Sequence, residues 1–184
     1  MSEIEQSKKT RGADEEENTI LVFHDEDSIE DMYLTFGVSG EEYGIGISYV
    51  TEVVGIQRIM EVPDVPHFIK GVINLRGKVI PVMDVRLRFN MEAVEYNERT
   101  VIIVLDINNV LVGLVVDYVS EVLEIPAADV EKPAQLKGTH NENSVIRGYG
   151  KRDEQVVMLL NIERLVSDHD IDLGCIVKEN QQNK

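Results

Sequence analysis

The chain has one cysteine, no tryptophan, four phenylalanines and six tyrosines among its 184 residues. A single thiol, Cys175, cannot form an internal disulfide, and this composition fits a reducing compartment. No run approaches the ~20 apolar residues that span a bilayer, and residues 1–19 contain no apolar stretch of signal-peptide length. We therefore expect a cytoplasmic protein without direct membrane insertion.

Basic residues are scarce, because 18 Lys and Arg stand against 34 Asp and Glu, a net charge of -16. This balance repels phosphate backbones, so nucleic acid is not an expected partner. The acids are concentrated at the start, where residues 1–31 hold 11 acidic and 3 basic side chains, half of the net charge.

Sequence signals of catalysis are also missing. No Gly-rich phosphate loop and no G-x-S-x-G nucleophile turn are present. The acidic pair Glu41-Glu42 falls in a predicted hairpin turn, where solvated side chains are the simpler interpretation. The four histidines are widely separated and make no metal-ligand spacing with one another or with Cys175: His24, His67, His140 and His169. We expect no catalytic residue, no metal and no cofactor.

From residue 32 onward, short segments rich in Val, Ile, Tyr and Phe alternate with turn residues, the pattern of an all-β protein. Residues 32–47 predict a first hairpin around Ser39-Gly40. Residues 69–75 and 78–84 predict a second hairpin, joined by Arg76-Gly77. Asn108-Asn109 predicts a third turn between two apolar runs. About ten short strands favour closed barrels or a sandwich over a parallel α/β sheet.

Helical signals are few. Ser48 followed by apolar residues at 50, 53 and 54 predicts one or two helical turns, and IERLV near the end predicts another. Pro63 and Pro66 remove backbone donors, so their segment should be an ordered loop. KRDE predicts the turn of a last hairpin.

This organisation predicts three regions. Residues 1–31 form an acidic arm that we expect to be disordered, and residues 167–184 form a polar tail. The apolar residues 20–23 within the arm are an edge strand, a docking segment or, most simply, part of a linker. Residues 32–166 form the folded part, which we interpret as two small barrels divided near 92–98.

Two blocks carry a resemblance to a known family: EEYGIGISYVTEVV, and VPDVPHFIKGVINLRGKVIPVMDVRLRF with its Pro-x-Phe-Ile-Lys-Gly and Asn-Leu-Arg-Gly elements. The chain resembles the CheW family over residues 32–166. The resemblance implies two packed five-stranded SH3-like β-barrels with short helices. It also implies a non-catalytic chemotaxis adaptor that couples methyl-accepting chemoreceptor tips to the CheW-like domain of the kinase CheA and helps assemble the signalling array. Such a protein would be cytoplasmic and recruited to membrane-associated receptor arrays.

The resemblance further implies a receptor-binding groove, and the matching positions are Val50, Glu52, Val53, Gly71, Arg76, Val101 and Ile102. A receptor tip is a helical hairpin, so an apolar groove with a few polar groups would fit it. Residues in contact with CheA are left unassigned.

Each group of these residues also has a simpler interpretation. The four aliphatic residues among them are equally typical of barrel core, and only their exposure separates the two possibilities. Composition alone favours a solvated turn arginine at Arg76, whereas the resemblance favours a guanidinium paired with Glu52. Gly71 inside a strand indicates a bulge or a close backbone approach.

Two other classes of function remain as alternatives. An oligonucleotide-binding barrel would need a basic groove with stacking aromatics, which this acidic sequence does not suggest. A small hydrolase would need a nucleophile, a base and oxyanion donors assembled from distant positions.

Overall fold

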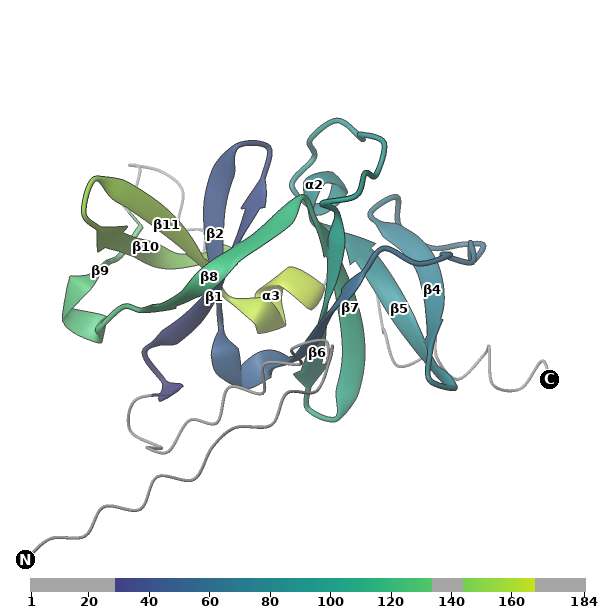
Figure 1. Cartoon of the computed structure of the whole chain (residues 1–184), viewed down its shortest axis with the longest axis horizontal. Coiled ribbons are helices and arrows are strands. Elements are labelled where there is room, and N and C mark those ends of the chain that lie inside the picture. Colours follow the sequence, from purple (N-terminus) through teal and green to yellow (C-terminus); the bar gives the residue numbers. More distant parts are fainter. Residues whose placement is uncertain (1–28, 134–143, 168–184) are drawn as a thin grey trace, which may run out of the picture.

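The structure is a computed structural model that describes residues 29–133 and 144–167, and Figure 1 shows two β-sheets packed side by side. The six-stranded sheet has the order β8-β1-β2-β11-β10-β9. Its strands are β1 (Met32–Val38), β2 (Glu41–Gly46), β8 (Tyr118–Glu124), β9 (Val130–Glu131), β10 (Ile146–Arg152) and β11 (Gln155–Leu160). The predicted all-β fold of two packed units is confirmed.

The five-stranded sheet has the order β3-β6-β7-β5-β4. Its strands are β3 (Val50–Gly55), β4 (Ile69–Leu75), β5 (Lys78–Asp84), β6 (Val101–Ile107) and β7 (Val110–Val116). The helical segments within the described residues are short: η1 (Ile47–Tyr49), α2 (Val85–Arg88), η2 (Ala127–Asp129) and α3 (Ile162–Val166). None of the helices in this part of the chain has the length and apolarity to cross a membrane.

The tight turns follow from residues that tolerate positive φ. Arg76 and Gly77 have φ of 51° and 84°, and Asn108 and Asn109 have 53° and 66°, as two-residue hairpin turns require. Both turns stand where the sequence predicts them. At the first hairpin the turn is tighter than predicted, because β2 already begins at Glu41.

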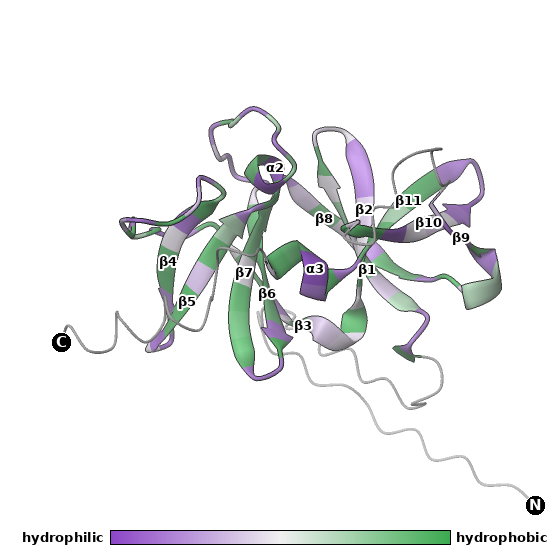
Figure 2. Cartoon of the chain, turned by 180° about the vertical axis from the view of Figure 1, so that it is seen from behind, coloured by the Kyte–Doolittle hydropathy of each residue, from purple (hydrophilic) through white to green (hydrophobic). Residues whose placement is uncertain are grey.

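Apolar residues fill three cores. The largest lies between the sheets and includes residues of both, together with Ile162, Leu165 and Val166 of α3, which Figure 1 places between the two halves. A second core belongs to the five-stranded sheet alone, and a third to the six-stranded sheet alone. Figure 2 shows hydrophobic residues along the strands and in α3.

Two sequence predictions need correction. The strands do not divide near 92–98, because β6 and β7 beyond this segment complete the sheet of β3, β4 and β5. Each sheet contains one parallel pair, β2 with β11 in the six-stranded sheet and β5 with β7 in the five-stranded sheet, and no local sequence pattern predicts these pairings. The helix predicted from Ser48 is only the single 3-10 turn η1, and Gly46 precedes it without a side-chain cap. The β-branched residues that follow form β3 and pair with β6.

The predicted final helical turn is confirmed as α3. Helix α2 was not predicted, although Asp84 is a good N-cap and accepts a hydrogen bond from the N–H of Arg86 at 2.9 Å. The arm, its apolar residues 20–23, Cys175 and most of the tail lie outside the described residues.

Candidate functional site

An ion pair joins the two edge strands of the five-stranded sheet. Arg76 Nη2 contacts Glu52 Oε1, which brings the β4–β5 turn against β3. The Arg76 side chain is 71% exposed and that of Glu52 is 30% exposed. The hydrogen bond to Glu52 raises the pKa of Arg76. The predicted pairing of Arg76 with Glu52 is therefore present, and it leaves most of the guanidinium available to a partner.

The turn itself holds Arg76 in place. A positive φ is uncommon for a residue with a side chain, and here Asn74 Oδ1 supports the turn by accepting the N–H of Gly77 at 2.9 Å. The segment that follows β3 also meets β4, because the backbones of Met60 and Val72 exchange hydrogen bonds of 2.8 and 2.9 Å. The guanidinium thus projects from a tight turn at the seam where β3 and the segment after it meet the β4–β5 hairpin.

A strip of apolar surface runs along the other face of β3. Val53 is 41% exposed and pairs with Ile103, and Gly55 pairs with Val101. A Cβ placed on Gly55 would meet no atom within 4 Å, so the surface beside Val101 is open. Val50 and Val101 are half-buried against the large core. We call Val50, Val53, Gly55 and Val101 the β3 strip.

Side chains alternate along a strand, so Glu52 and Val53 point to opposite faces of β3. The ion pair therefore lies on one side of this edge strand and the β3 strip on the other. A partner that wraps the edge can meet apolar surface and a charged group together.

Two of the predicted site residues lie elsewhere. Ile102 is fully buried in the core of the five-stranded sheet, on the face opposite Val101, so it belongs to the barrel interior. Gly71 has φ of 140° and lies at a register shift of β4. A Cβ there would lie 1.9 Å from the Met60 carbonyl oxygen, so this glycine admits the 60–61 backbone. The predicted close backbone approach at Gly71 is confirmed. The position that a side chain would occupy faces the 60–61 backbone and not the β3 strip.

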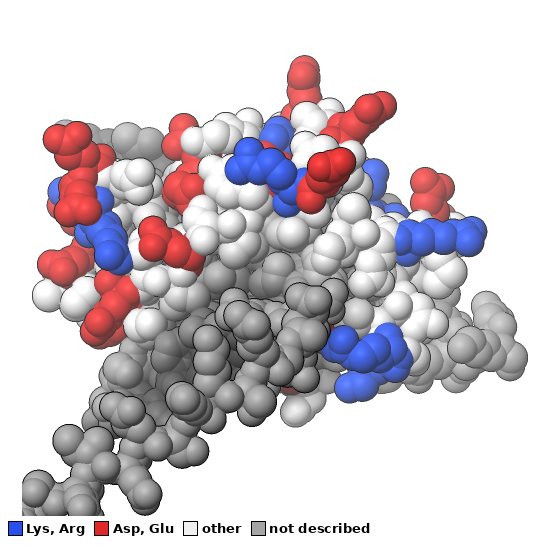
Figure 3. Space-filling model, in the orientation of Figure 1, with Lys and Arg blue, Asp and Glu red and all other residues white. Residues whose placement is uncertain are grey.

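The charges are unevenly distributed over the surface. Figure 3 shows Lys and Arg side chains over the lower right, where the five-stranded sheet lies, whereas Asp and Glu predominate on the left over the six-stranded sheet. Exposed bases of the five-stranded side include Arg58, Arg76 and Lys78.

Sequence reasoning missed three features near or beyond this site. Met60 is 47% exposed beside the seam. Its position in a Pro-containing loop did not predict this exposure. Gly55 was not singled out, although it ends an apolar strand. Glu42, which was interpreted as a solvated turn residue, accepts hydrogen bonds from Tyr118 at 3.0 Å and Ser120 at 3.0 Å.

Comparison with known proteins gives a single answer. The family model described as CheW-like domain matches residues 32–170. The chain belongs to the CheW family. The CheW chemotaxis protein of Klebsiella aerogenes is 37% identical over 147 residues, which cover 80% of this chain and 88% of the relative. That of Helicobacter pylori is 29% identical over 135 residues, covering 73% and 81%.

A solved CheW structure has the same fold. The scaffolding protein CheW of Thermoanaerobacter tengcongensis superimposes with a TM-score of 0.69 at 32% identity, covering 77% of this chain and 96% of that one. The CheW family is one of chemotaxis scaffold proteins and not of catalysts, and this chain shares its fold.

Proposed function

We propose that this CheW-family protein couples the cytoplasmic tips of methyl-accepting chemoreceptors to the histidine kinase CheA, and that it helps assemble the receptor-kinase array. It does so by binding, without catalysis and without a cofactor. It acts in the cytoplasm and reaches the membrane through the receptors it binds.

The observation that carries this proposal is the edge of β3, where the exposed Arg76–Glu52 pair lies on one side and the β3 strip on the other. A helical hairpin presents apolar residues along one face with polar groups at intervals, and such a face matches an apolar strip bordered by one charged pair. Arg76 supplies several donors in a fixed plane, which can set the register of the helix. CheA would bind to other surfaces through its CheW-like domain.

Two affinity measurements test the proposal. Purified chain should bind a soluble receptor-tip fragment and, separately, the CheW-like domain of CheA, and a ternary complex of the three should form. Absence of binding to both would overturn the adaptor function. Saturable ATP binding by calorimetry, or turnover of any substrate by the purified chain, would equally contradict a non-catalytic role.

A further inference from the structure

The chain passes between the two sheets at two places before α3. The first passage is η1, between β2 and β3, and the second is Asp117 alone, between β7 and β8. A single residue thus connects a strand of the five-stranded sheet to a strand of the six-stranded sheet. How this residue is held bears directly on the angle between the sheets.

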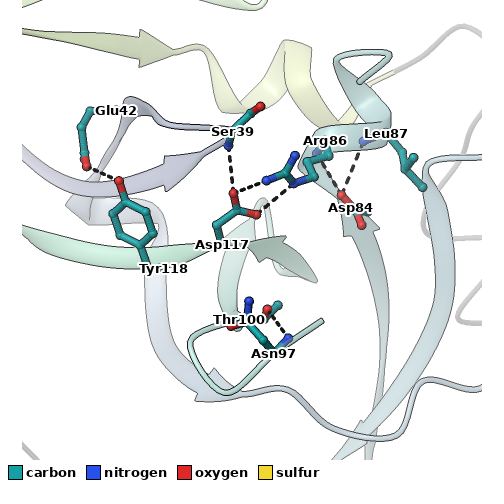
Figure 4. A network of polar contacts seen from close by, with 9 residues as sticks. All are labelled: Ser39, Glu42, Asp84, Arg86, Leu87, Asn97, Thr100, Asp117 and Tyr118. Carbon is teal, nitrogen blue, oxygen red and sulfur yellow. Dashed lines mark hydrogen bonds and ion pairs between the residues drawn. The ribbon is translucent and has the colours of Figure 1, made fainter. Parts of the chain in front are cut away.

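Asp117 has three hydrogen-bonding partners, and Figure 4 shows two of them, Arg86 and Ser39. Its Oδ1 accepts from Arg86 Nε at 3.0 Å, and its Oδ2 accepts from Arg86 Nη2 and from the Ser39 N–H, the latter at 2.8 Å. Its own N–H donates to the Gly37 carbonyl oxygen at 3.0 Å. Gly37 and Ser39 belong to the six-stranded sheet and its β1–β2 turn, whereas Arg86 belongs to α2, which directly follows β5.

Arg86 is itself fixed by its neighbours. Its N–H donates to the capping carboxylate of Asp84, and Asp84 also accepts from the Tyr96 hydroxyl at 2.7 Å. Asp84 is 3% exposed, so this support lies inside the protein. Tyr96, Asp84, Arg86 and Asp117 therefore form a continuous chain of hydrogen bonds that ends at Ser39, on the far sheet.

This contact differs from the other ion pairs in the described residues. Arg76–Glu52 lies within the five-stranded sheet and Lys151–Glu131 within the six-stranded sheet, so Arg86–Asp117 is the ion pair of this part of the chain that bridges the two. Its side chains are only 16% and 27% exposed, which limits screening by salt. The two-point contact of a guanidinium with a carboxylate also fixes direction as well as distance.

The large apolar core supplies most of the attraction between the sheets, but apolar burial is non-directional. A bidentate pair at the single-residue passage adds the directional constraint that burial lacks. Without this constraint, apolar burial alone does not fix the angle between the two sheets.

We infer that the Arg86–Asp117 pair is a positioning device that sets the angle between the two sheets and thereby the affinity of the β3 edge for its partner. Val50 and Val101 of the β3 strip pack on the inter-sheet core, so a change in the angle moves the floor of the strip relative to its border. The link to partner affinity rests on the proposed function, whereas the link to the angle does not.

The angle is tested by electron–electron distance measurement on spin labels. Labels at Lys78→Cys and Glu154→Cys, in a Cys175→Ser chain, report from exposed positions on the two different sheets. In Asp117→Asn and in Arg86→Lys, which retains the charge but not the planar fork, the distance distribution should shift or broaden by about 2 Å. A second label pair, Gln57→Cys with Lys78→Cys, stays on the five-stranded side and should not change.

Lys151→Met is the matched control, because it removes an ion pair contained in one sheet, and it should leave both distributions unchanged. Receptor-tip affinity of Asp117→Asn and Arg86→Lys should fall about five-fold, with circular dichroism spectra like that of the parent. Unchanged inter-sheet distances in both variants would overturn the inference, and so would changed distances with full affinity. If the parent itself binds no receptor tip, the proposed function fails while the distance measurement still decides the role of the pair.

Discussion

Glu52 and Arg76 form one ion pair although 24 residues separate them, and the pair joins the two outer strands of the five-stranded sheet. An exposed pair of this kind contributes little to the free energy of unfolding, because water and salt screen it. The pair therefore matters mainly because it holds the guanidinium at a defined place, across the β3 edge from the β3 strip. Substitutions at this pair should affect binding more than folding.

Arg76→Glu should weaken receptor-tip binding by at least about ten-fold, because a reversed charge replaces the donors beside the strip and repels Glu52. The melting temperature should change little, since the side chain is 71% exposed. Calorimetric titration and a circular dichroism melt measure the two quantities. Affinity equal to that of the parent would remove Arg76 from the site.

Lys78→Glu is the control for this variant, because it reverses an exposed charge two residues away that makes no ion pair in the described residues. It should keep most of the affinity. The double variant Glu52→Arg with Arg76→Glu should recover the cross-strand pair but not receptor binding, because the donors then project from β3. Affinity for CheA should survive in all three, and a parallel loss of it would indicate damage to the fold.

Gly71→Ala should destabilise the fold by at least about 2 kcal/mol, because the new Cβ collides with the Met60 carbonyl and φ of 140° strains any side chain. Urea unfolding measures the loss. Gly55→Ala is the matched control at another strand glycine, where a Cβ meets nothing within 4 Å, and it should change the free energy of unfolding by no more than about 0.5 kcal/mol. Equal stability of the two variants would contradict the close approach of the 60–61 backbone to Gly71.

Tyr96→Phe should alter the pH dependence of stability. Burial raises the pKa of Tyr96 most, and its hydrogen bond to Asp84 and the charge of that carboxylate raise it further. The folded state thus holds this proton more tightly than the unfolded state, whose tyrosine titrates near pH ~10. The stability that Tyr96 contributes is fully present below that pH and is lost as the pH rises through the folded-state pKa.

The variant should therefore be less stable than the parent by about 1–2 kcal/mol at pH 8, and the difference should shrink above about pH 10. Tyr43 and Tyr118 also have raised pKa values, so the free energy of unfolding of the variant should still fall at alkaline pH. Urea unfolding from pH 8 to 11 gives both curves. A difference that stays constant over this range would show that the Tyr96 hydroxyl does not titrate with folding.

Removal of residues 1–28 should leave the free energy of unfolding within about 1 kcal/mol of the parent, because the arm has few apolar residues to contribute to a core. Asp31 must be kept, since its carbonyl accepts the N–H of Ile125 at 2.8 Å. Thermal melts of both chains measure the change. A large drop would show that residues 20–23 form an integral strand.

The hairpins were predictable because their signals are local. Arg76-Gly77 and Asn108-Asn109 each separate two apolar runs by two residues, and each forms the expected turn. The ion pair of Arg76 was predictable only through the family resemblance, because nothing local connects a turn to a strand that precedes it by 24 residues. The aliphatic residue type alone did not distinguish the half-buried Val101 from the fully buried Ile102 next to it.

The pairing of the strands was not predictable in the same way. Asp117 interrupts the apolar run of residues 110–119, and that single acid marks the passage between the sheets. A charged residue within a run is compatible with an exposed position on one strand, so the sequence alone did not identify it as a junction. Its role as a junction is visible only from the partners of its carboxylate, Arg86 of α2, which follows β5, and Ser39 of the β1–β2 turn.

The interleaved strand order has a consequence for how the chain folds as it is synthesised. All strands of the five-stranded sheet lie within residues 50–116, so that sheet has every partner it needs once Val116 has left the ribosome. The six-stranded sheet must wait for Met158 to pair with Tyr43, a contact of high sequence separation. Until then β2 lacks its β11 neighbour, and the edge of β2 that later pairs with β11 stays open to other chains. We expect the nascent protein to acquire its two halves in sequence, with the second half completed only at the end of translation.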